Sequence, residues 1–297
     1  MFRFKSASVF LVHFTLQMLN LGCWAVLITL VGGIKLLLPF ARLTHNLNRL
    51  NSYFEIAFGV LSIQLIKLFN GIELELHTDG ELTPEHWYLI TANHRSYLDI
   101  ILLIGCAKDR YPAPKFFLKK ELIWLPFVGL GAWALDMPFM QRHSRADIVK
   151  RPELKGQDIA TTQAACRKYR STPTTIINFV EGTRFTPAKH ASKNSPYTHL
   201  LPPKAAGIAF TLAAMGDLFT HILDISIVYP QNTQWPMMDM LCGNMKRIVI
   251  DVKVLPLSPN LFGNYQDDPI FRDAFREQLN MRWTEKDVRI TKLLDNN

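Results

Sequence analysis

The feature that most constrains this chain is a long uncharged segment near its amino terminus. From Ser6 to Ile34 the sequence contains no Asp, Glu, Lys or Arg. A helix needs roughly 20 apolar residues to cross the hydrocarbon of a bilayer, so this segment can cross with some tilt. It is longer than the apolar core of a secretory signal peptide, and it has no small-residue cleavage site. We therefore expect a retained membrane anchor over residues 1–45, and not a buried core helix.

Two forms of this anchor are compatible with the sequence. The tripeptide Asn20–Leu21–Gly22 interrupts the apolar run, so the segment is either one tilted span or two short helices lying in one leaflet. Basic residues flank it on both sides, and the positive-inside rule therefore gives no orientation. We assign residues 46–297 to a single domain that follows the anchor.

Composition narrows the class of protein. Of the 297 residues, 48% are hydrophobic and 20% are charged, which excludes a disordered chain. The formal net charge is +8, and the first acidic residue is Glu55. Such a balance is typical of chains with an anionic partner, such as nucleic acid, a lipid headgroup or a phosphorylated metabolite. The four cysteines lie far apart without a Cys-x-x-Cys pair, so we expect a reducing compartment and no disulfide framework.

Beyond the anchor, apolar strand patterns alternate with helical ones. This alternation predicts a mixed α/β fold, with a largely central β-sheet flanked by helices. The tail from Pro269 has the pattern of a charged, exposed helix, and residues 186–203 have the composition of a loop. We expect strands at 72–77, 84–91, 174–180, 222–229 and 248–254, and helices at 43–70, 96–107, 159–169 and 205–215.

Several chemistries have no motif in the chain. There is no Gly-x-Ser-x-Gly nucleophile elbow and no P-loop. The stretch from Gly129 to Ala134 imitates a dinucleotide fingerprint but follows Pro126 instead of a strand. The nine histidines form no convincing His-x-x-x-His pair, and we propose neither a metal site nor another cofactor.

The first candidate site is the segment Asn93-His94-Arg95-Ser96-Tyr97-Leu98-Asp99, which joins a buried strand to an apolar helix. Catalytic groups gather in such loops of α/β folds. If the helix begins near Ser96, His94 can fold back so that Asp99 orients one ring nitrogen and leaves the other free as a base. The alternative is that Asp99 only caps the helix, with Ser96 completing a capping box.

The second candidate site is Glu181-Gly182-Thr183-Arg184, at the carboxyl end of another buried strand. Gly182 allows backbone N–H groups to approach an anion, and the guanidinium of Arg184 matches a phosphate. The alternative is a tight turn in which Arg184 pairs with Glu181.

A third block runs from Phe117 to Gly129 and on to Arg142, with apolar residues that would line a groove and Arg142 as a further phosphate contact. Its alternative is core packing with solvated basic residues. The fourth block, Ile225 to Pro230, is a strand closed by proline, which taken alone is more often structural.

These four blocks, in this order, resemble those of the glycerolipid and lysophospholipid acyltransferases, the family of the 1-acylglycerol-3-phosphate acyltransferases. The family's Asn-His-x-x-x-x-Asp matches Asn93, His94 and Asp99, and its Phe-Pro-Glu-Gly-Thr-Arg matches residues 179–184 with Val180 in place of proline. The resemblance covers residues 87–230, about half of the chain. The arginine block lacks its usual appearance around Arg142, so this match is less close than that of Arg184.

The resemblance implies acyl transfer from acyl-CoA or acyl carrier protein to the hydroxyl of a lysophospholipid, with lysophosphatidate as the expected acceptor. His94 would be the base and Asp99 its partner, while the other matched residues would bind substrate: Asn93, Arg142, Glu181, Gly182, Thr183 and Arg184. No cofactor and no nucleic-acid partner would be needed. The enzyme would act on membrane phospholipid precursors at the cytoplasmic face of a bacterial inner membrane. Other lyso-lipid acceptors, a membrane-anchored thioesterase and a non-enzymatic scaffold are the alternatives.

Overall fold

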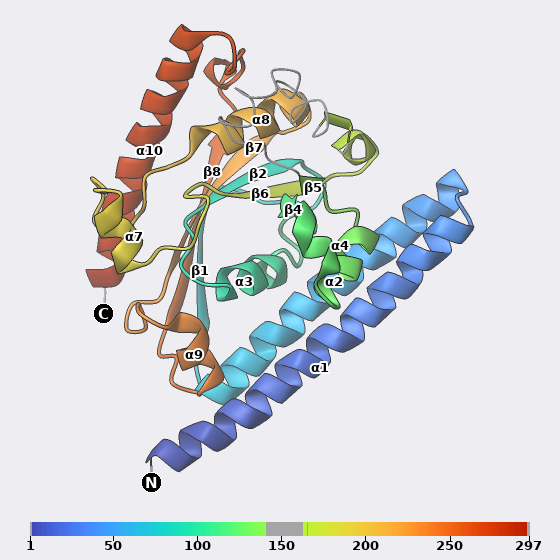
Figure 1. The fold of residues 1–297 in the computed structure, drawn as a ribbon, viewed down its shortest axis with the longest axis vertical. Coiled ribbons are helices and arrows are strands. Elements are labelled where there is room, and N and C mark those ends of the chain that lie inside the picture. Colours follow the sequence, from blue (N-terminus) through green and yellow to red (C-terminus); the bar gives the residue numbers. More distant parts are fainter. Residues whose placement is uncertain (1, 141–162, 165, 296–297) are drawn as a thin grey trace.

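The computed structural model describes residues 2–140, 163–164 and 166–295. Its centre is a six-stranded mixed sheet in the order β1-β8-β7-β2-β6-β3, with β7 and β8 antiparallel and the other neighbours parallel (Figure 1). The strands are β1 (Leu74–Asp79), β2 (Tyr88–Ala92), β3 (Pro114–Phe116), β6 (Thr175–Phe179), β7 (His221–Val228) and β8 (Ile248–Pro256). A second sheet pairs β4 (Leu118–Lys119) with β5 (Phe139–Met140).

Helices cover both faces of this sheet, which gives three layers. One core lies between the sheet and the helices α2 (Ala41–Asn70), α3 (Leu98–Cys106) and α9 (Pro236–Leu241). The other core lies under α8 (Ala205–Met215) and α10 (Pro269–Asp295). All five residues of β2 are buried, as expected for a central parallel strand that is covered on both faces. The mixed α/β fold predicted from the sequence is therefore confirmed.

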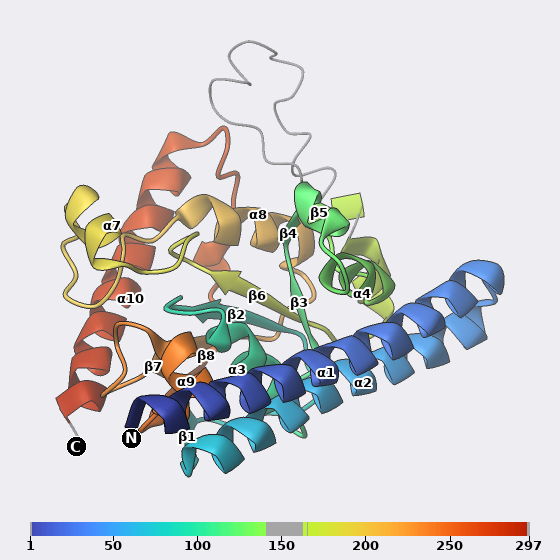
Figure 2. The same cartoon turned by 60° about the horizontal axis from the view of Figure 1, so that its bottom comes forward.

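The amino-terminal segment forms a hairpin of two long helices. Helix α1 (Phe2–Leu37) runs without a break and turns at residues 38–40 into α2, which lies beside it in both views (Figures 1 and 2). Both helices are long and apolar enough to cross a membrane by length and composition. The anchor boundary expected at residue 45 falls inside α2.

Of the two forms left open by the sequence, α1 does not show two short helices separated at Asn20–Leu21–Gly22, because it is continuous through these residues. The Asn20 side chain donates to Ser62 Oγ at 2.9 Å and to the Phe58 carbonyl at 3.2 Å, so it joins α1 to α2. A single glycine in a helix costs only about 1 kcal/mol, which the packing of a long helix can offset. The polar residue that suggested an interruption is therefore a contact between helices.

Most of the other long elements agree with the sequence patterns. All five expected strands are present within a few residues, and α8 has the expected bounds. The expected helix at 159–169 lies partly outside the described residues; residues 163–164 and 166 are helical, and the short helix η3 (Arg167–Ser171) overlaps its end. The loop at 186–203 contains α7 (Pro187–Ser192). Helix α10 is not simply exposed, because Phe275, Trp283 and Lys286 are buried against the sheet. The sequence analysis did not predict the short strands β3, β4 and β5 or the helix α9. It also did not predict the short elements η1 (Lys120–Trp124), α4 (Val128–Ala134) and η4 (Pro259–Leu261).

Candidate active site

The two predicted site segments meet because their strands are neighbours in the sheet. Strands β2 and β6 are parallel, and their last residues, Ala92 and Phe179, are paired in register. The segments that follow these residues therefore leave the same edge of the sheet. A backbone hydrogen bond of 2.7 Å from Phe185 N–H to the His94 carbonyl ties the two segments together.

His94 folds back onto Asp99, as the sequence predicted. The distance from His94 Nδ1 to Asp99 Oδ2 is 2.8 Å. The same oxygen accepts the backbone N–H groups of Arg95 at 2.7 Å and Ser96 at 2.9 Å. Asp99 thus also performs the carboxylate half of a capping box, and the two interpretations weighed from the sequence are compatible. A carboxylate on Nδ1 fixes the tautomer in which Nε2 is an acceptor.

The imidazole of His94 is fixed by ring stacking as well as by the hydrogen bond at Nδ1. It stacks on Phe179 with the ring centroids 4.0 Å apart, and only 11% of its side chain is exposed. Among the described residues, no group hydrogen-bonds to Nε2, and His94 lines a cavity. This geometry presents a base to whatever occupies the cavity.

The cavity has a volume of about 410 Å³ and two chemically distinct parts. Phe116, Phe117, Leu118 and Phe179 give it apolar walls. Of the third block, which was expected to line a groove, only Phe117 and Leu118 line this cavity. The polar part holds three cationic residues, Arg184, Lys189 and Lys204. An amphipathic ligand with an anionic group fits this division.

The turn after β6 depends on glycine. Gly182 has φ of +66°, and a Cβ there would lie 2.9 Å from Lys204 Cδ. A side chain would therefore be strained by its backbone conformation and would displace Lys204. The expected use of the Gly182 amide for an anion does not fit, because this N–H donates to the Phe179 carbonyl at 2.8 Å. The N–H groups of Thr183 and Arg184, two residues that line the cavity, donate to no other described residue.

Arg184 lies over the ring of Tyr97, with its guanidinium carbon 3.9 Å from the ring centroid. Lys189 supports the same turn by donating to Thr183 Oγ1 at 2.7 Å and to the Arg184 carbonyl at 3.0 Å. The alternative turn, in which Arg184 pairs with Glu181, is not what the structure shows. Arg184 instead faces the cavity and remains available to an anion.

Glu181 has a different role from the one expected. Its carboxylate forms no ion pair with Arg184 and accepts the backbone N–H groups of His94 at 3.0 Å and Leu201 at 3.1 Å. Burial raises its pKa to about 7, although these two hydrogen bonds and the nearby charge of Arg95 act in the opposite direction. Glu181 therefore fixes the backbone of His94 and does not orient Arg184.

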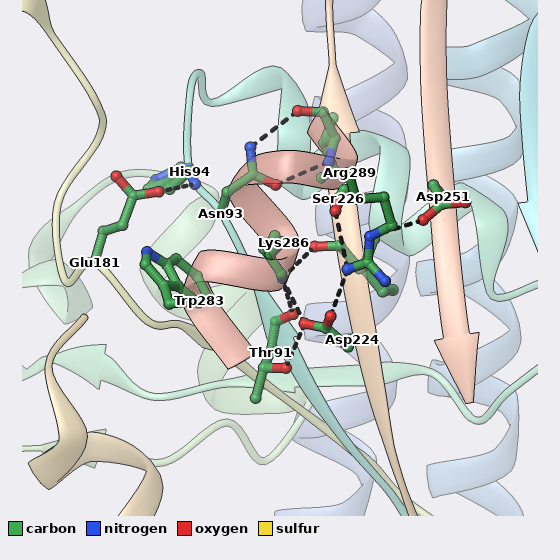
Figure 3. A network of polar contacts seen from close by, with 12 residues as sticks. Thr91, Asn93, His94, Glu181, Asp224, Ser226, Asp251, Trp283, Lys286 and Arg289 are labelled. Atoms are coloured by element: carbon green, nitrogen blue, oxygen red, sulfur yellow. Dashed lines mark hydrogen bonds and ion pairs between the residues drawn. The ribbon is translucent and has the colours of Figure 1, made fainter. Parts of the chain in front are cut away.

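Asn93 is also a positioning residue, contrary to the expectation that it binds substrate. Its side-chain amide donates to the Ile227 carbonyl at 2.9 Å and accepts the Ile227 N–H at 2.8 Å (Figure 3). Asn93 is 1% exposed. These two hydrogen bonds join the end of β2 to β7. They therefore fix the backbone position from which the next residue, His94, extends.

Tyr229 was missed by the sequence analysis. It is fully buried at the end of β7, and its hydroxyl donates to Asp99 Oδ1 at 2.6 Å. Its position before Pro230 in the fourth block was the available signal, but the pattern alone indicated a structural strand.

Behind the site, α10 carries a buried network of charges that the sequence analysis also missed. Lys286 donates to the carbonyls of Thr91 at 2.9 Å and Ile225 at 2.8 Å, and lies 2.7 Å from Asp224 (Figure 3). Arg289 contacts the other oxygen of Asp224 and lies 3.2 Å from Asp251. The network joins the end of β2, from which the His94 segment starts, to the middle of β7.

One predicted site residue has no structural description. Arg142 lies outside the described residues, so its expected contact with a phosphate stays a prediction.

Comparison with known proteins now adds to this geometry. The family model described as "Acyltransferase" matches residues 73–230, more than half of the chain and the whole of the described site. The chain belongs to this acyltransferase family. The resemblance noted from the four sequence blocks is thereby confirmed at the level of the family.

Several named acyltransferases are similar to the chain. The rat 1-acyl-sn-glycerol-3-phosphate acyltransferase delta is 24% identical over 76% of this chain and 59% of its own length. The chicken lysocardiolipin acyltransferase 1 is 25% identical over 79% of this chain and 61% of its own length. The match thus spans about three fifths of each of these relatives.

A solved acyltransferase structure shares the fold. The crystal structure of the 1-acyl-sn-glycerophosphate acyltransferase PlsC from Thermotoga maritima superposes with a TM-score of 0.57 at 16% identity. The superposition covers 96% of this chain and 97% of that one, so the likeness includes the amino-terminal hairpin. At this identity it shows the fold alone.

Proposed function

We propose that this acyltransferase moves a fatty acyl chain from an acyl thioester to the hydroxyl of a lysophospholipid, with lysophosphatidate as the acceptor. The observation that carries the proposal is the His94–Asp99 pair, whose free Nε2 faces a cavity with an apolar wall and a cationic end. A lysophospholipid offers the matching parts: an acyl chain, a hydroxyl and a phosphate.

In this mechanism His94 acts as a general base. Its Nε2 takes the proton of the acceptor hydroxyl while the oxygen attacks the thioester carbonyl carbon. Asp99 stabilises the imidazolium that forms and keeps the ring oriented. The tetrahedral intermediate then collapses with cleavage of the carbon–sulfur bond, and His94 returns the proton to the leaving sulfur. The products are the diacyl lipid and a free thiol, without a covalent intermediate on the enzyme.

Two groups of residues would bind the negative charges of the reaction, which are the acceptor phosphate and the oxyanion. Arg184, with Lys204 nearby, binds the acceptor phosphate, for which a guanidinium fork is well suited. The amides of Thr183 and Arg184 stabilise the negative charge that develops on the carbonyl oxygen. The role expected for Arg142 as a second phosphate ligand belongs to this proposal as well.

The donor and the location follow from the same chemistry. Acyl-CoA and acyl carrier protein are cytoplasmic thioesters, so we place the catalytic domain on the cytoplasmic face of a bacterial inner membrane. The apolar α1–α2 hairpin supports membrane attachment, since both of its helices have the length and composition of membrane helices. Basic residues near the amino terminus would strengthen contact with anionic lipid.

A second acceptor class has a specific observation in its favour. One relative is named lysocardiolipin acyltransferase 1, and the cationic end of the cavity would bind the phosphate of that class of lyso-lipid too. The acceptor headgroup is therefore one of the variables in the test.

The test is formation of phosphatidate from lysophosphatidate and acyl-CoA by the detergent-solubilised protein and its His94→Ala variant. We expect activity in the parent and a loss of at least about 10²-fold in the variant. His77→Ala, at a half-exposed histidine on β1 outside the cavity, is the control and should keep full activity.

Other outcomes separate the alternatives. Equal product from parent and His94→Ala would contradict the mechanism. Thioester consumption without an acylated lipid would favour the thioesterase. Product only with another lyso-lipid would correct the acceptor and leave the reaction class intact.

A further inference from the structure

A second apolar surface lies on the short helices η1 and α4 and on the turn between them, outside the hairpin and outside the site. Its large side chains are solvent-exposed, with exposed fractions of 87% for Trp124, 48% for Leu125, 52% for Phe127 and 55% for Leu130. Exposed apolar residues grouped in this way mark a contact with a partner or a membrane. We call these four residues the η1–α4 surface.

The backbone conformation that holds Phe127 outward is strained. Phe127 has φ of +61° and ψ of −46°, and Val128 N–H donates to the Pro126 carbonyl at 2.6 Å. This is a γ-turn with positive φ, which is rare and strained for a residue other than glycine. The turn presents a half-exposed aromatic ring. We therefore expect the contact that offsets the backbone strain to lie outside the chain.

The η1–α4 surface is fixed to the hairpin by close packing. A Cβ added to Gly32 of α1 would lie 2.5 Å from the Cβ of Ala134 in α4, so the two helices touch there. Lys35 of α1 donates to the Ala134 carbonyl at 2.9 Å and forms an ion pair with Asp136 at 2.8 Å. Figures 1 and 2 both show α4 beside the hairpin. Membrane attachment of the hairpin therefore brings the η1–α4 surface to the same bilayer.

We propose that the η1–α4 surface inserts into the interfacial layer of the membrane that holds the hairpin. Tryptophan and phenylalanine favour this layer, where an aromatic body can lie among the acyl chains near the headgroups. From Leu122 to Leu135 the sequence has no charged residue. A lipid surface fits this composition better than a protein partner, because protein interfaces have a polar rim around their apolar centre.

Insertion would connect the membrane to the cavity, a consequence that rests on the proposed function. Strand β4 (Leu118–Lys119) leads directly into η1, and Phe116, Phe117 and Leu118 line the apolar wall. When the η1–α4 surface is inserted, this wall lies near the lipid. The acyl chain of the acceptor can then enter the cavity from the bilayer without exposure to water, which would be unfavourable for each CH₂ group.

The first experiment does not depend on enzymatic activity. The full chain is reconstituted into phosphatidylethanolamine–phosphatidylglycerol vesicles, with or without brominated phospholipid, and tryptophan fluorescence is compared with that of Trp124→Phe. We expect the emission lost in the variant to be quenched by brominated lipid and shielded from aqueous iodide. Emission from Trp124 that is quenched by iodide but not by brominated lipid would overturn the proposal.

The second experiment separates insertion from catalysis with two matched triple variants. One replaces Trp124, Leu125 and Phe127 by serine. The control replaces three α10 residues of similar exposure, Ile270 (84%), Met281 (56%) and Val288 (52%). Helix α10 lies far from α4 in both views (Figures 1 and 2).

Acyl transfer is measured with lysophosphatidate embedded in vesicles and with a short-chain acceptor that is monomeric in solution. We expect the η1–α4 variant to lose at least about tenfold with vesicles only, and the control variant to keep both rates. Equal vesicle rates for the two variants would overturn the proposal. Absence of activity in the parent would instead contradict the proposed function, and the fluorescence result would stand by itself.

Discussion

The Tyr229 hydroxyl donates to Asp99 Oδ1 at 2.6 Å, and so joins the end of β7 to the start of α3 across 130 residues of sequence. The other carboxylate oxygen, Oδ2, accepts from His94, Arg95 and Ser96. Both oxygens are therefore held, and the carboxylate cannot rotate freely. Burial, with the charge of Asp99 as the second cause, raises the pKa of Tyr229 well above its usual value, so the phenol stays a donor.

We expect Tyr229→Phe to lower kcat roughly tenfold with little change in KM. Without the phenol, the Asp99 carboxylate gains freedom and His94 is oriented less well, and small misplacements of a base reduce the rate strongly. Stability should fall by about 1–3 kcal/mol, because a buried carboxylate oxygen loses its donor. Steady-state kinetics and thermal unfolding of the detergent-solubilised protein measure the two effects.

Tyr111→Phe is the matched control for this prediction. Tyr111 has the same 2% exposure as Tyr229, and its hydroxyl donates to the Leu103 carbonyl at 2.7 Å. This variant should lose comparable stability but keep kcat. A similar fall of kcat in both variants would show that Tyr229 acts only through stability.

Arg184→Gln tests the assignment of the phosphate contact. We expect KM for lysophosphatidate to rise about tenfold or more, because the glutamine amide is uncharged and lacks the guanidinium fork. A monoacylglycerol acceptor, which has no phosphate, should show no such change. Arg276→Gln, at a residue of α10 that lies over Tyr265, serves as the control. A KM that rises equally for both acceptors would mean that Arg184 shapes the cavity and does not bind phosphate.

The parts of the site that the sequence predicted are local in the chain. His94 and Asp99 are five residues apart and share one loop and helix start, so the order of residues was enough to suggest their contact, with helix capping by Asp99 as the alternative. The strands followed from short apolar runs bounded by turns, and α8 from its helical pattern. Such features depend on near neighbours and little on the rest of the fold.

The parts that the sequence did not predict depend on which strands are adjacent. Asn93 contacts Ile227 only because β2 lies beside β7, and Glu181 reaches the backbone of His94 only because β6 lies on the other side of β2. Strand order is not encoded in the periodicity of any single segment. The prediction that α10 is exposed was wrong for a related reason. The sequence pattern places Lys286 on a solvent-exposed face, and only the fold shows that it is buried against its partner Asp224.

Glu181 makes stability depend on pH. Burial raises the pKa of this carboxyl from its ordinary 4.5 to about 7, so the folded protein retains a proton that the unfolded chain releases. The stabilisation is full below about pH 4.5 and is lost as the pH rises through about 7, with a total near 3 kcal/mol as an order of magnitude. We expect Glu181→Gln, which does not titrate, to lack this component.

The measurement is the difference in melting temperature between parent and Glu181→Gln across this pH range. The parent should lose stability relative to the variant as the pH rises. Glu285→Gln, at an exposed position of α10, should show a difference that does not vary with pH in this window. A pH-independent difference for Glu181→Gln would contradict the raised pKa.

Lys286→Met tests the buried network behind the site. Methionine has a similar length but no charge, so the Thr91 and Ile225 carbonyls would lose a donor and Asp224 would keep Arg289 but lose Lys286. Breaking a buried ion pair on one side typically costs about 3–5 kcal/mol. We expect the melting temperature to fall by roughly 10 °C. We also expect kcat/KM to be lost at a lower temperature than in the parent, because the Trp283 side chain of α10 donates to the Leu201 carbonyl at 2.9 Å.

Lys292→Met, at an exposed lysine of the same helix, should leave both quantities unchanged. Equal melting temperatures for the two variants would show that the network contributes nothing to the stability of the site.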